Sequence, residues 1–224
     1  MLKYQHCFIL IFIISQLLSG CNNQPYSETA ITPIRLQQHI HDSWQLAHRN
    51  FIGFPSPHAF SVCHDLSCHN VSTVSLTETE WQQVVGHFQP VAQKAATERH
   101  QIATAIAVME KLVGNKTGTA GDRGKNQLSG SRHGQLDCID EATNTSVYLR
   151  IMDNEGLLTW HRAAPRTSRG PLSGQAPHNT ATIIETQSQQ RYAVDAWFFA
   201  NGQPPAIVLL DHWKQGWRPA MLEN

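Results

Sequence analysis

The sequence predicts an α+β fold in which N-terminal helices pack on an antiparallel β-sheet. Between residues 75 and 113, apolar residues recur at three- and four-residue spacing, which is typical of amphipathic helices. Two β-rich segments, residues 177–185 and 191–199, flank a short polar stretch, which indicates a β-hairpin. A hydrophobic content of 41% over 224 residues is sufficient for one packed domain, which we place at residues 36–224.

The charge balance restricts the partners that we expect. The chain has 17 Lys+Arg against 17 Asp+Glu, and only 15% of its residues are charged. Proteins that coat nucleic acid need a basic excess, so we expect no nucleic-acid partner. No phosphate-binding Gly loop or dinucleotide fingerprint follows a predicted strand, and we expect no cofactor.

Residues 1–20 have the pattern of an export signal. Lys3 precedes an apolar run at residues 8–14, which is shorter than the roughly 20 residues of a transmembrane helix. The segment that follows, Leu18-Ser-Gly-Cys21, resembles the bacterial lipobox. That resemblance implies cleavage before Cys21 and lipidation of its thiol, for example by palmitate. The alternative is a plain signal peptide followed by an incidental cysteine.

The lipobox resemblance also implies a location. Asn22 follows the cysteine in place of Asp, which implies the periplasmic face of the outer membrane in preference to the inner membrane. Residues 21–35 contain Pro25 and Pro33 and few large apolar groups, so we interpret them as the lipidated tether. The exported part has 16 Lys+Arg against 17 Asp+Glu, because residues 1–20 contain one lysine and no acid.

Cys63 and Cys68 are close enough in sequence for a turn to bring their sulfurs together. Export favours oxidation, and a local disulfide is our first interpretation. Two alternatives stay open: a zinc site, because a histidine follows each cysteine, and a loose variant of the c-type haem attachment pattern.

Two helices are expected before residue 114. Ser75 and Glu78 have capping-box spacing and would open a helix that ends near Pro90. A second helix over residues 91–113 would be capped by Gly114.

Two polar, basic segments follow and precede the predicted hairpin. Residues 114–134 are glycine-rich and are expected to be exposed, either as a lid over a substrate or as a flexible connector. Residues 160–169 add three arginines and are expected to form a loop. If both segments border one cleft, the site would be positive and would favour an anionic substrate.

Cys138 is the cysteine left without a local partner. A helix is expected over residues 139–152, with Asp140 and Glu141 in its first turn. A cysteine at a helix N-terminus favours the thiolate and is a candidate nucleophile. The alternative is a buried, inert cysteine.

The expected hairpin brings two polar side chains together. A turn centred on Gln187 and Ser188 would place Asp195 opposite Thr180 and diagonally from His178, on one face of the sheet. A turn shifted by one residue would put the two side chains on opposite faces. Residues 207–210 are expected to add a further strand, followed by an aromatic segment that packs on the domain.

Three motifs occur in one order along residues 134–199. They are Asp137-Cys-Ile-Asp-Glu-Ala142, His178-Asn-Thr-Ala and Tyr192-Ala-Val-Asp195. In this order and spacing, the chain resembles the papain-like and transglutaminase-like cysteine peptidase superfamily, and in particular the bacterial transglutaminase-like cysteine proteinases. The resemblance implies that Cys138 is the nucleophile, His178 the base and Asp195 the group that orients the histidine.

Other site residues are weaker candidates. The backbone N–H of Cys138 is expected to be one oxyanion donor, and Gln135 is a candidate for the second, although it stands closer to the cysteine than in papain-like enzymes. His133, His161 and Asp211 are rival bases or orienters.

We therefore expect an envelope-anchored thiol hydrolase or acyltransferase that acts on a peptide or isopeptide amide of a periplasmic peptide or protein. The alternatives are a binding or assembly lipoprotein that retains the fold without turnover, and a thiol that serves redox exchange.

Overall fold

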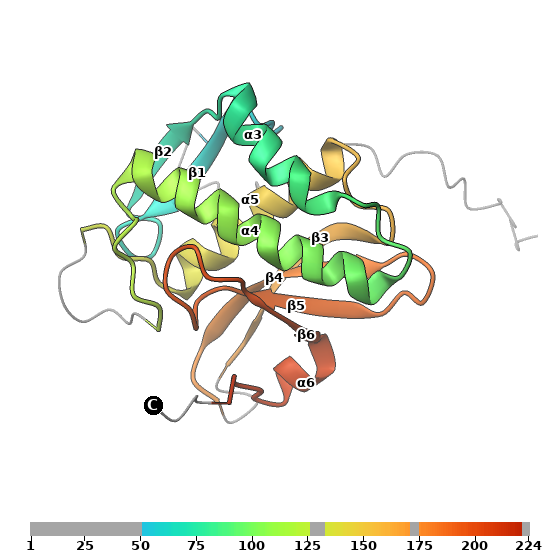
Figure 1. Cartoon of the computed structure of the whole chain (residues 1–224). Helices are drawn as coiled ribbons and strands as arrows, with labels where there is room; N and C mark the ends of the chain where they lie inside the picture. The colour runs from blue at the N-terminus through green and yellow to red at the C-terminus, as the bar shows by residue number, and fades with distance from the viewer. Residues whose placement is uncertain (1–50, 126–132, 171–174, 221–224) are drawn as a thin grey trace, which may run out of the picture. The chain divides into compact units, whose positions relative to one another are not determined.

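The computed structural model describes residues 51–125, 133–170 and 175–220. These residues form a mixed α/β structure with two antiparallel sheets and four α-helices (Figure 1), which confirms the α+β class. The elements in chain order are β1 (Phe60–His64), β2 (Asn70–Val74), α3 (Glu78–Val85), the 3-10 helix η1 (Gly86–Phe88), α4 (Ala95–Thr117), α5 (Cys138–Asn154), β3 (His161–Arg169), β4 (His178–Glu185), β5 (Arg191–Asp195), β6 (Ala206–Leu209) and α6 (Leu210–Lys214).

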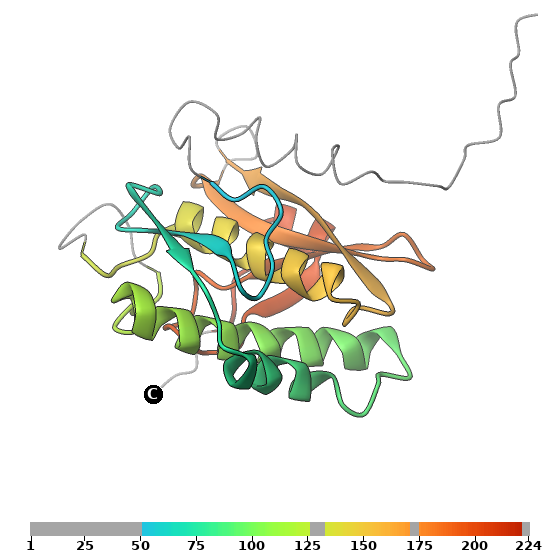
Figure 2. The same ribbon diagram turned by 90° about the horizontal axis from the view of Figure 1, so that it is seen from above.

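Helix α5 is the central element. The larger sheet has the strand order β3-β4-β5-β6, and the smaller sheet is the β1–β2 hairpin. Helix α5 packs against β3 and β4 of the larger sheet and against β1 of the smaller one, and α4 lies along α5 and α3 (Figure 2). The main core is built from apolar side chains of these elements, among them Ile106, Met109, Leu149, Ile151 and Ile183. Helix α5 is therefore held by contacts from several sides.

The hairpin has the register expected from its sequence. Ala181 pairs with Val194, and Ile184 pairs with Arg191, so Asp195 lies opposite Thr180. Pairing is symmetric about Gln187 and Ser188. The one-residue shift, which would have separated the two polar side chains, does not occur.

The N-terminal cap of α3 lies two residues later than expected. Thr77 is the N-cap and forms a capping box with Glu80, in place of the expected pair Ser75 and Glu78. The reason is that the chain is still anchored at Leu76, whose N–H donates to the Pro57 carbonyl and whose side chain is buried. The helix starts only after that contact.

Helix α4 spans Ala95–Thr117, so the expected helix at residues 91–113 is shifted toward the C-terminus. Its C-cap is Gly118, in the left-handed conformation with φ 77°. Gly114 is inside the helix, where a Cβ would come within 2.9 Å of Asn201 Nδ2 and 3.0 Å of the Ala120 backbone. Gly114 therefore permits close packing and does not end the helix.

Residues 161–169 form strand β3, not the loop expected from their basic composition. The strand pairs with β4 at the edge of the sheet, with an irregular register between Ala164 and Thr167. Proline has no backbone N–H to donate, and an edge strand tolerates Pro165 because one side of the strand makes no ladder hydrogen bonds. The sequence-based prediction of a loop was wrong because it relied on the three arginines of this segment.

Candidate active site

Cys138 is the first residue of α5, and Asp137 caps the helix. Asp137 Oδ1 accepts hydrogen bonds from the backbone N–H groups of Ile139 at 2.9 Å and Asp140 at 3.1 Å. The Asp140 side chain accepts from the Asp137 N–H at 3.2 Å, which completes a capping box. These capping bonds leave the Cys138 N–H unused. The half-buried Cys138 thiol thus sits at the N-terminus of α5, at the positive end of the helix dipole.

A disulfide loop after β1 holds this first turn. Cys63 and Cys68 are joined in a disulfide, as expected from their spacing. Ser67 donates to Asp137 Oδ2 from its N–H at 2.8 Å and from its Oγ at 2.9 Å, and the Cys68 N–H donates to Asp140 Oδ1 at 2.6 Å. The capping carboxylates of α5 are therefore fixed by the loop as well as by their own helix.

The same loop bears on the zinc and haem alternatives. The sulfurs of Cys63 and Cys68 and a carboxylate oxygen of Asp140 lie within 4.8 Å of one another. Because the two sulfurs are bonded to each other, neither can serve as a thiolate ligand to zinc or attach a haem. In this state the cysteines are structural.

His178 and Asp195 meet across the hairpin. His178 opens β4, Asp195 ends β5, and the distance between His178 Nε2 and Asp195 Oδ2 is 2.7 Å. Both side chains are buried. A carboxylate at Nε2 leaves the other ring nitrogen, Nδ1, to face a different partner.

The His178 side chain also has a hydrogen-bond contact with Cys138. Burial by itself would lower the pKa of His178, but hydrogen bonds to Asp195 and to the Cys138 thiol outweigh it, and the pKa of His178 is raised above its ordinary value. The structure thus brings together the three residues that the sequence motifs point to. A histidine in hydrogen-bond contact with a thiol is placed to exchange a proton with it.

Aromatic rings enclose the histidine. The His178 ring lies 4.7 Å from the Trp197 ring and 5.5 Å from the Trp213 ring, measured between centroids. The guanidinium of Arg169 lies over the Trp213 ring, 4.4 Å from its centroid. Such packing limits water around the His178–Asp195 pair and strengthens their hydrogen bond.

Sequence reasoning missed Asn179. Its Nδ2 donates to Cys138 Sγ at 3.7 Å, so two consecutive residues of β4 reach the thiol. The one available signal in the sequence was its position next to His178.

Gln135 is oriented toward the glycine-rich segment. Its Nε2 donates to the carbonyl of Gly121 at 3.2 Å and to that of Gly134 at 3.3 Å. To serve an oxyanion, this amide would first have to leave both carbonyls.

The rival bases and orienters lie in other surroundings. His161 is fully buried and its Nδ1 is 2.9 Å from Glu98 Oε1. The His133 side chain is 91% exposed, and its nearest carboxylate is Asp65 at 3.9 Å. Asp211 is exposed on α6. None of these contacts involves Cys138.

The described part of residues 114–134 is mostly exposed, as expected, but it is tied to the rest of the domain at several points. Asp122 is buried and accepts from the Leu136 N–H at 2.8 Å, and the Lys125 N–H donates to the Trp197 carbonyl at 2.6 Å. A Cβ on Gly124 would lie 2.5 Å from the Phe199 backbone. The end of this described segment is therefore anchored to the domain through Asp122, Gly124 and Lys125, while residues 126–132 are outside the described part.

The arginines of β3 serve the fold. Arg162 donates to the carbonyls of Leu158 and His161 and lies 3.7 Å from Asp153. Arg166 donates to Thr143, and Arg169 donates to carbonyls at Trp213 and Trp217. The expected positive substrate loop is thus replaced by a strand whose arginines bind protein groups.

Three buried carboxyl groups, Glu110 of α4 and Asp140 and Glu141 of α5, form a cluster near the N-terminus of α5. Burial, strengthened by the nearby charge of Asp122, raises the pKa of Glu110 to about 8, despite a hydrogen bond from the Gly202 N–H. Burial and the charge of Asp137 raise the pKa of Asp140 to about 7, and burial and Glu110 raise that of Glu141 well above its ordinary value. This cluster therefore favours protonated carboxyl groups near neutral pH.

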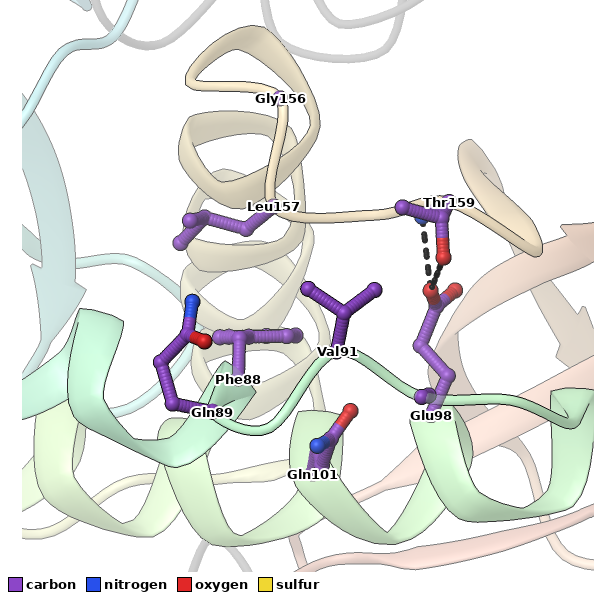
Figure 3. Close-up of a pocket in the computed structure, with 9 residues that line it drawn as sticks. Phe88, Gln89, Val91, Glu98, Gln101, Gly156, Leu157 and Thr159 are labelled. Atoms are coloured by element: carbon purple, nitrogen blue, oxygen red, sulfur yellow. Dashed lines mark hydrogen bonds between the residues drawn. The ribbon is translucent and has the colours of Figure 1, made fainter.

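A pocket between the segment after α3 and the α5–β3 connection is separate from Cys138 (Figure 3). Glu98 in its wall accepts from the Thr159 N–H and hydroxyl, both at 2.6 Å, and from the backbone of Trp160 and His161. Burial opposes ionisation of Glu98, but its hydrogen bonds, led by that from His161, hold its pKa at about 2. A carboxylate saturated by protein donors has a structural role.

The expected signal peptide at residues 1–20, the lipidation site Cys21 and the tether at residues 21–35 lie outside the described residues. Within the described ranges, every helix is too short or too polar to span a membrane.

Comparison of the chain with protein-family models, with curated proteins and with solved structures gave no match.

Proposed function

We propose that this protein is an envelope-anchored thiol hydrolase or acyltransferase that acts on a peptide or isopeptide amide through Cys138, His178 and Asp195. The fold proposed for it is the transglutaminase-like, papain-like core implied by the sequence motifs. One observation carries the proposal: buried His178 is hydrogen-bonded to Asp195 at 2.7 Å and also to the thiol at the start of α5. Nucleophile, base and orienting acid are thereby in contact.

In the acylation step, the Cys138 thiolate attacks the amide carbonyl carbon and forms a C–S bond. The imidazolium of His178 gives its proton to the leaving nitrogen as the C–N bond breaks, and a thioester remains on Cys138. Asp195 keeps the ring oriented and stabilises its positive charge through Oδ2.

In the deacylation step, neutral His178 takes a proton from water or from an acceptor amine, which attacks the thioester. The C–S bond breaks, and the thiolate–imidazolium pair is restored. Water gives hydrolysis and an amine gives transamidation, and both reactions use the same acyl-enzyme.

The proposed substrate is a peptide or protein of the periplasm. Residues 18–21 resemble a lipobox, and a lipid on Cys21 would hold the enzyme at the periplasmic face of the outer membrane. The disulfide between Cys63 and Cys68 suits an oxidising compartment.

The test is the alkylation rate of Cys138 as a function of pH, measured on the full chain in detergent with the labelled site identified by mass spectrometry. We expect rapid labelling well below pH 8.5, the approximate pKa of an unperturbed thiol, and loss of this low-pH reactivity in His178→Ala. His87→Ala, which removes an exposed histidine on η1, should label like the wild type.

Slow labelling with an ordinary thiol pKa, or equal profiles for wild type and His178→Ala, would reject the catalytic pair. The binding or assembly lipoprotein would then be the better interpretation. A stable mixed disulfide between Cys138 and a partner protein would instead indicate redox exchange.

A further inference from the structure

Asn179 places a second polar group on the thiol. Its Nδ2 lies 3.7 Å from Cys138 Sγ, while the neighbouring residue His178 hydrogen-bonds to the same thiol. The Asn179 side chain is half-buried at the start of β4, where Asn179 pairs with Ser168 of β3. The ladder pairing limits the movement of the backbone that carries this amide.

Acyl transfer requires donors for the charge that develops on the substrate oxygen. That oxygen is bonded to the carbon which the sulfur attacks, so its donors must lie close to the sulfur. The N–H of Cys138 is one such group, because the capping bonds of α5 use the N–H groups of Ile139 and Asp140. One donor leaves a second position to be filled.

The two candidate amides differ in what they contact. Gln135 Nε2 is hydrogen-bonded to the carbonyls of Gly121 and Gly134, whereas Asn179 Nδ2 is directed at Cys138 Sγ. When the Cys138 thiolate attacks, its negative charge passes to the substrate oxygen and the sulfur becomes a weak, neutral acceptor, so the Asn179 N–H is free to donate to the oxyanion. Transfer of the Gln135 amide would break bonds to two carbonyl oxygens.

We propose that the side-chain amide of Asn179, together with the backbone N–H of Cys138, forms the oxyanion hole of this enzyme. In the tetrahedral intermediate, the former carbonyl oxygen carries the negative charge and accepts from Asn179 Nδ2 and from Cys138 N. When the C–N bond breaks, the C=O bond re-forms and both donors return to their resting contacts. This assignment rests on the proposed acyl-transfer function.

The test compares two reactions of the same thiol in the full chain in detergent. Acylation by p-nitrophenyl acetate passes through an oxyanion and releases p-nitrophenolate, whereas alkylation by iodoacetamide occurs at a saturated carbon and forms none. In Asn179→Ala we expect acylation to fall by roughly 100-fold. Alkylation should stay within about threefold of the wild type, because the thiolate–imidazolium pair is retained.

Three further variants sharpen the comparison. Asn179→Asp keeps the size of the side chain but replaces the donor with a negative charge, and its acylation should be at least as slow as that of Asn179→Ala. Asn154→Ala removes an amide at the other end of α5, where it donates to the Pro55 carbonyl, and should leave both rates unchanged. Gln135→Ala tests the competing assignment directly.

The outcomes separate the two proposals. Loss of acylation with retained alkylation in Asn179→Ala supports the oxyanion role. If Asn179→Ala slows acylation and alkylation equally, Asn179 only helps to position the thiol, and the oxyanion role is rejected. Unchanged rates in Asn179→Ala would also reject it. So would a selective loss of acylation that occurs in Gln135→Ala and not in Asn179→Ala. A wild type that is not acylated at Cys138 would overturn the proposed function itself.

Discussion

Trp213 Nε1 donates a 2.7 Å hydrogen bond to Oδ2 of Asp195, the same oxygen that accepts from His178. Both Trp213 and Asp195 are buried, and Oδ1 of Asp195 has no hydrogen-bond partner among the described residues. The orientation of this carboxylate therefore depends on Oδ2. A residue of α6 thus positions the carboxylate that is hydrogen-bonded to His178.

Replacing Trp213 by Phe should weaken this arrangement while keeping most of the buried ring. Without the indole donor, the Asp195 carboxylate is less restrained, and we expect the alkylation rate of Cys138 near neutral pH to fall by roughly 3- to 10-fold. Loss of a hydrogen bond to a charged acceptor should also lower the free energy of unfolding by about 2 kcal/mol. Trp217→Phe is the matched control, because the Trp217 ring contacts the Phe198 ring and not the Asp195 carboxylate. Equal effects of the two substitutions would contradict a positioning role for Trp213.

Asp137→Ala should disturb both the helix and the thiol. The side chain accepts bonds from the first turn of α5 and from Ser67, so its removal should cost about 2 kcal/mol of unfolding free energy. The alkylation rate of Cys138 should fall as the turn frays. Thr77→Ala removes the corresponding cap of α3 and should cost about 1 kcal/mol without changing that rate. Chemical denaturation and thiol labelling measure the two effects, and a Thr77→Ala variant that also lost reactivity would show that the effect is general destabilisation.

The disulfide should stabilise an unusual loop. Residues 65–68 all have positive φ, between 55° and 67°, although none is glycine, and such backbone is unfavourable for side-chain-bearing residues. Replacing both Cys63 and Cys68 by Ala should lower the free energy of unfolding by roughly 2 kcal/mol, the value for closing a short loop. Because the loop donates to Asp137 and Asp140, Cys138 reactivity should fall as well. Reduction of the wild type with dithiothreitol should reproduce both effects. Unchanged labelling of Cys138 after reduction would show that its reactivity does not depend on the disulfide.

Buried Glu110 should make stability depend on pH. Its pKa is raised to about 8 in the folded protein from about 4.5 in the unfolded chain, so between these values the folded state binds more protons. The free energy of unfolding should therefore fall as pH rises from about 4.5 to 8. In Glu110→Gln this slope should shrink, and the variant should be more stable than wild type at pH 8 by at least about 1 kcal/mol. Glu78→Gln, at an exposed position of α3, should keep the wild-type slope in urea titrations. If the pH dependence of the unfolding free energy is unchanged in Glu110→Gln, a group other than Glu110 causes it.

Local patterns in the chain were sufficient for much of the site. The helix start at Cys138 follows from acids that suit a helix N-terminus, and the spacing of Cys63 and Cys68 predicts their disulfide. The hairpin register follows from the turn position, because strand pairing is symmetric about Gln187 and Ser188. These features depend on groups within about twenty residues of one another.

Long-range contacts decided the rest. The sequence could not show that Trp213 reaches Asp195, that Asn179 reaches Cys138, or that residues 161–169 pair at the edge of the sheet, because each depends on how distant elements pack. Packing also moved the helix boundaries: Leu76 anchors the chain before α3, and Gly114 allows close contact instead of ending α4. The sequence by itself therefore determined the candidate site residues and their local elements. Only the tertiary structure decided which donors surround them, since a hydrogen bond between remote residues requires the whole core to be in place.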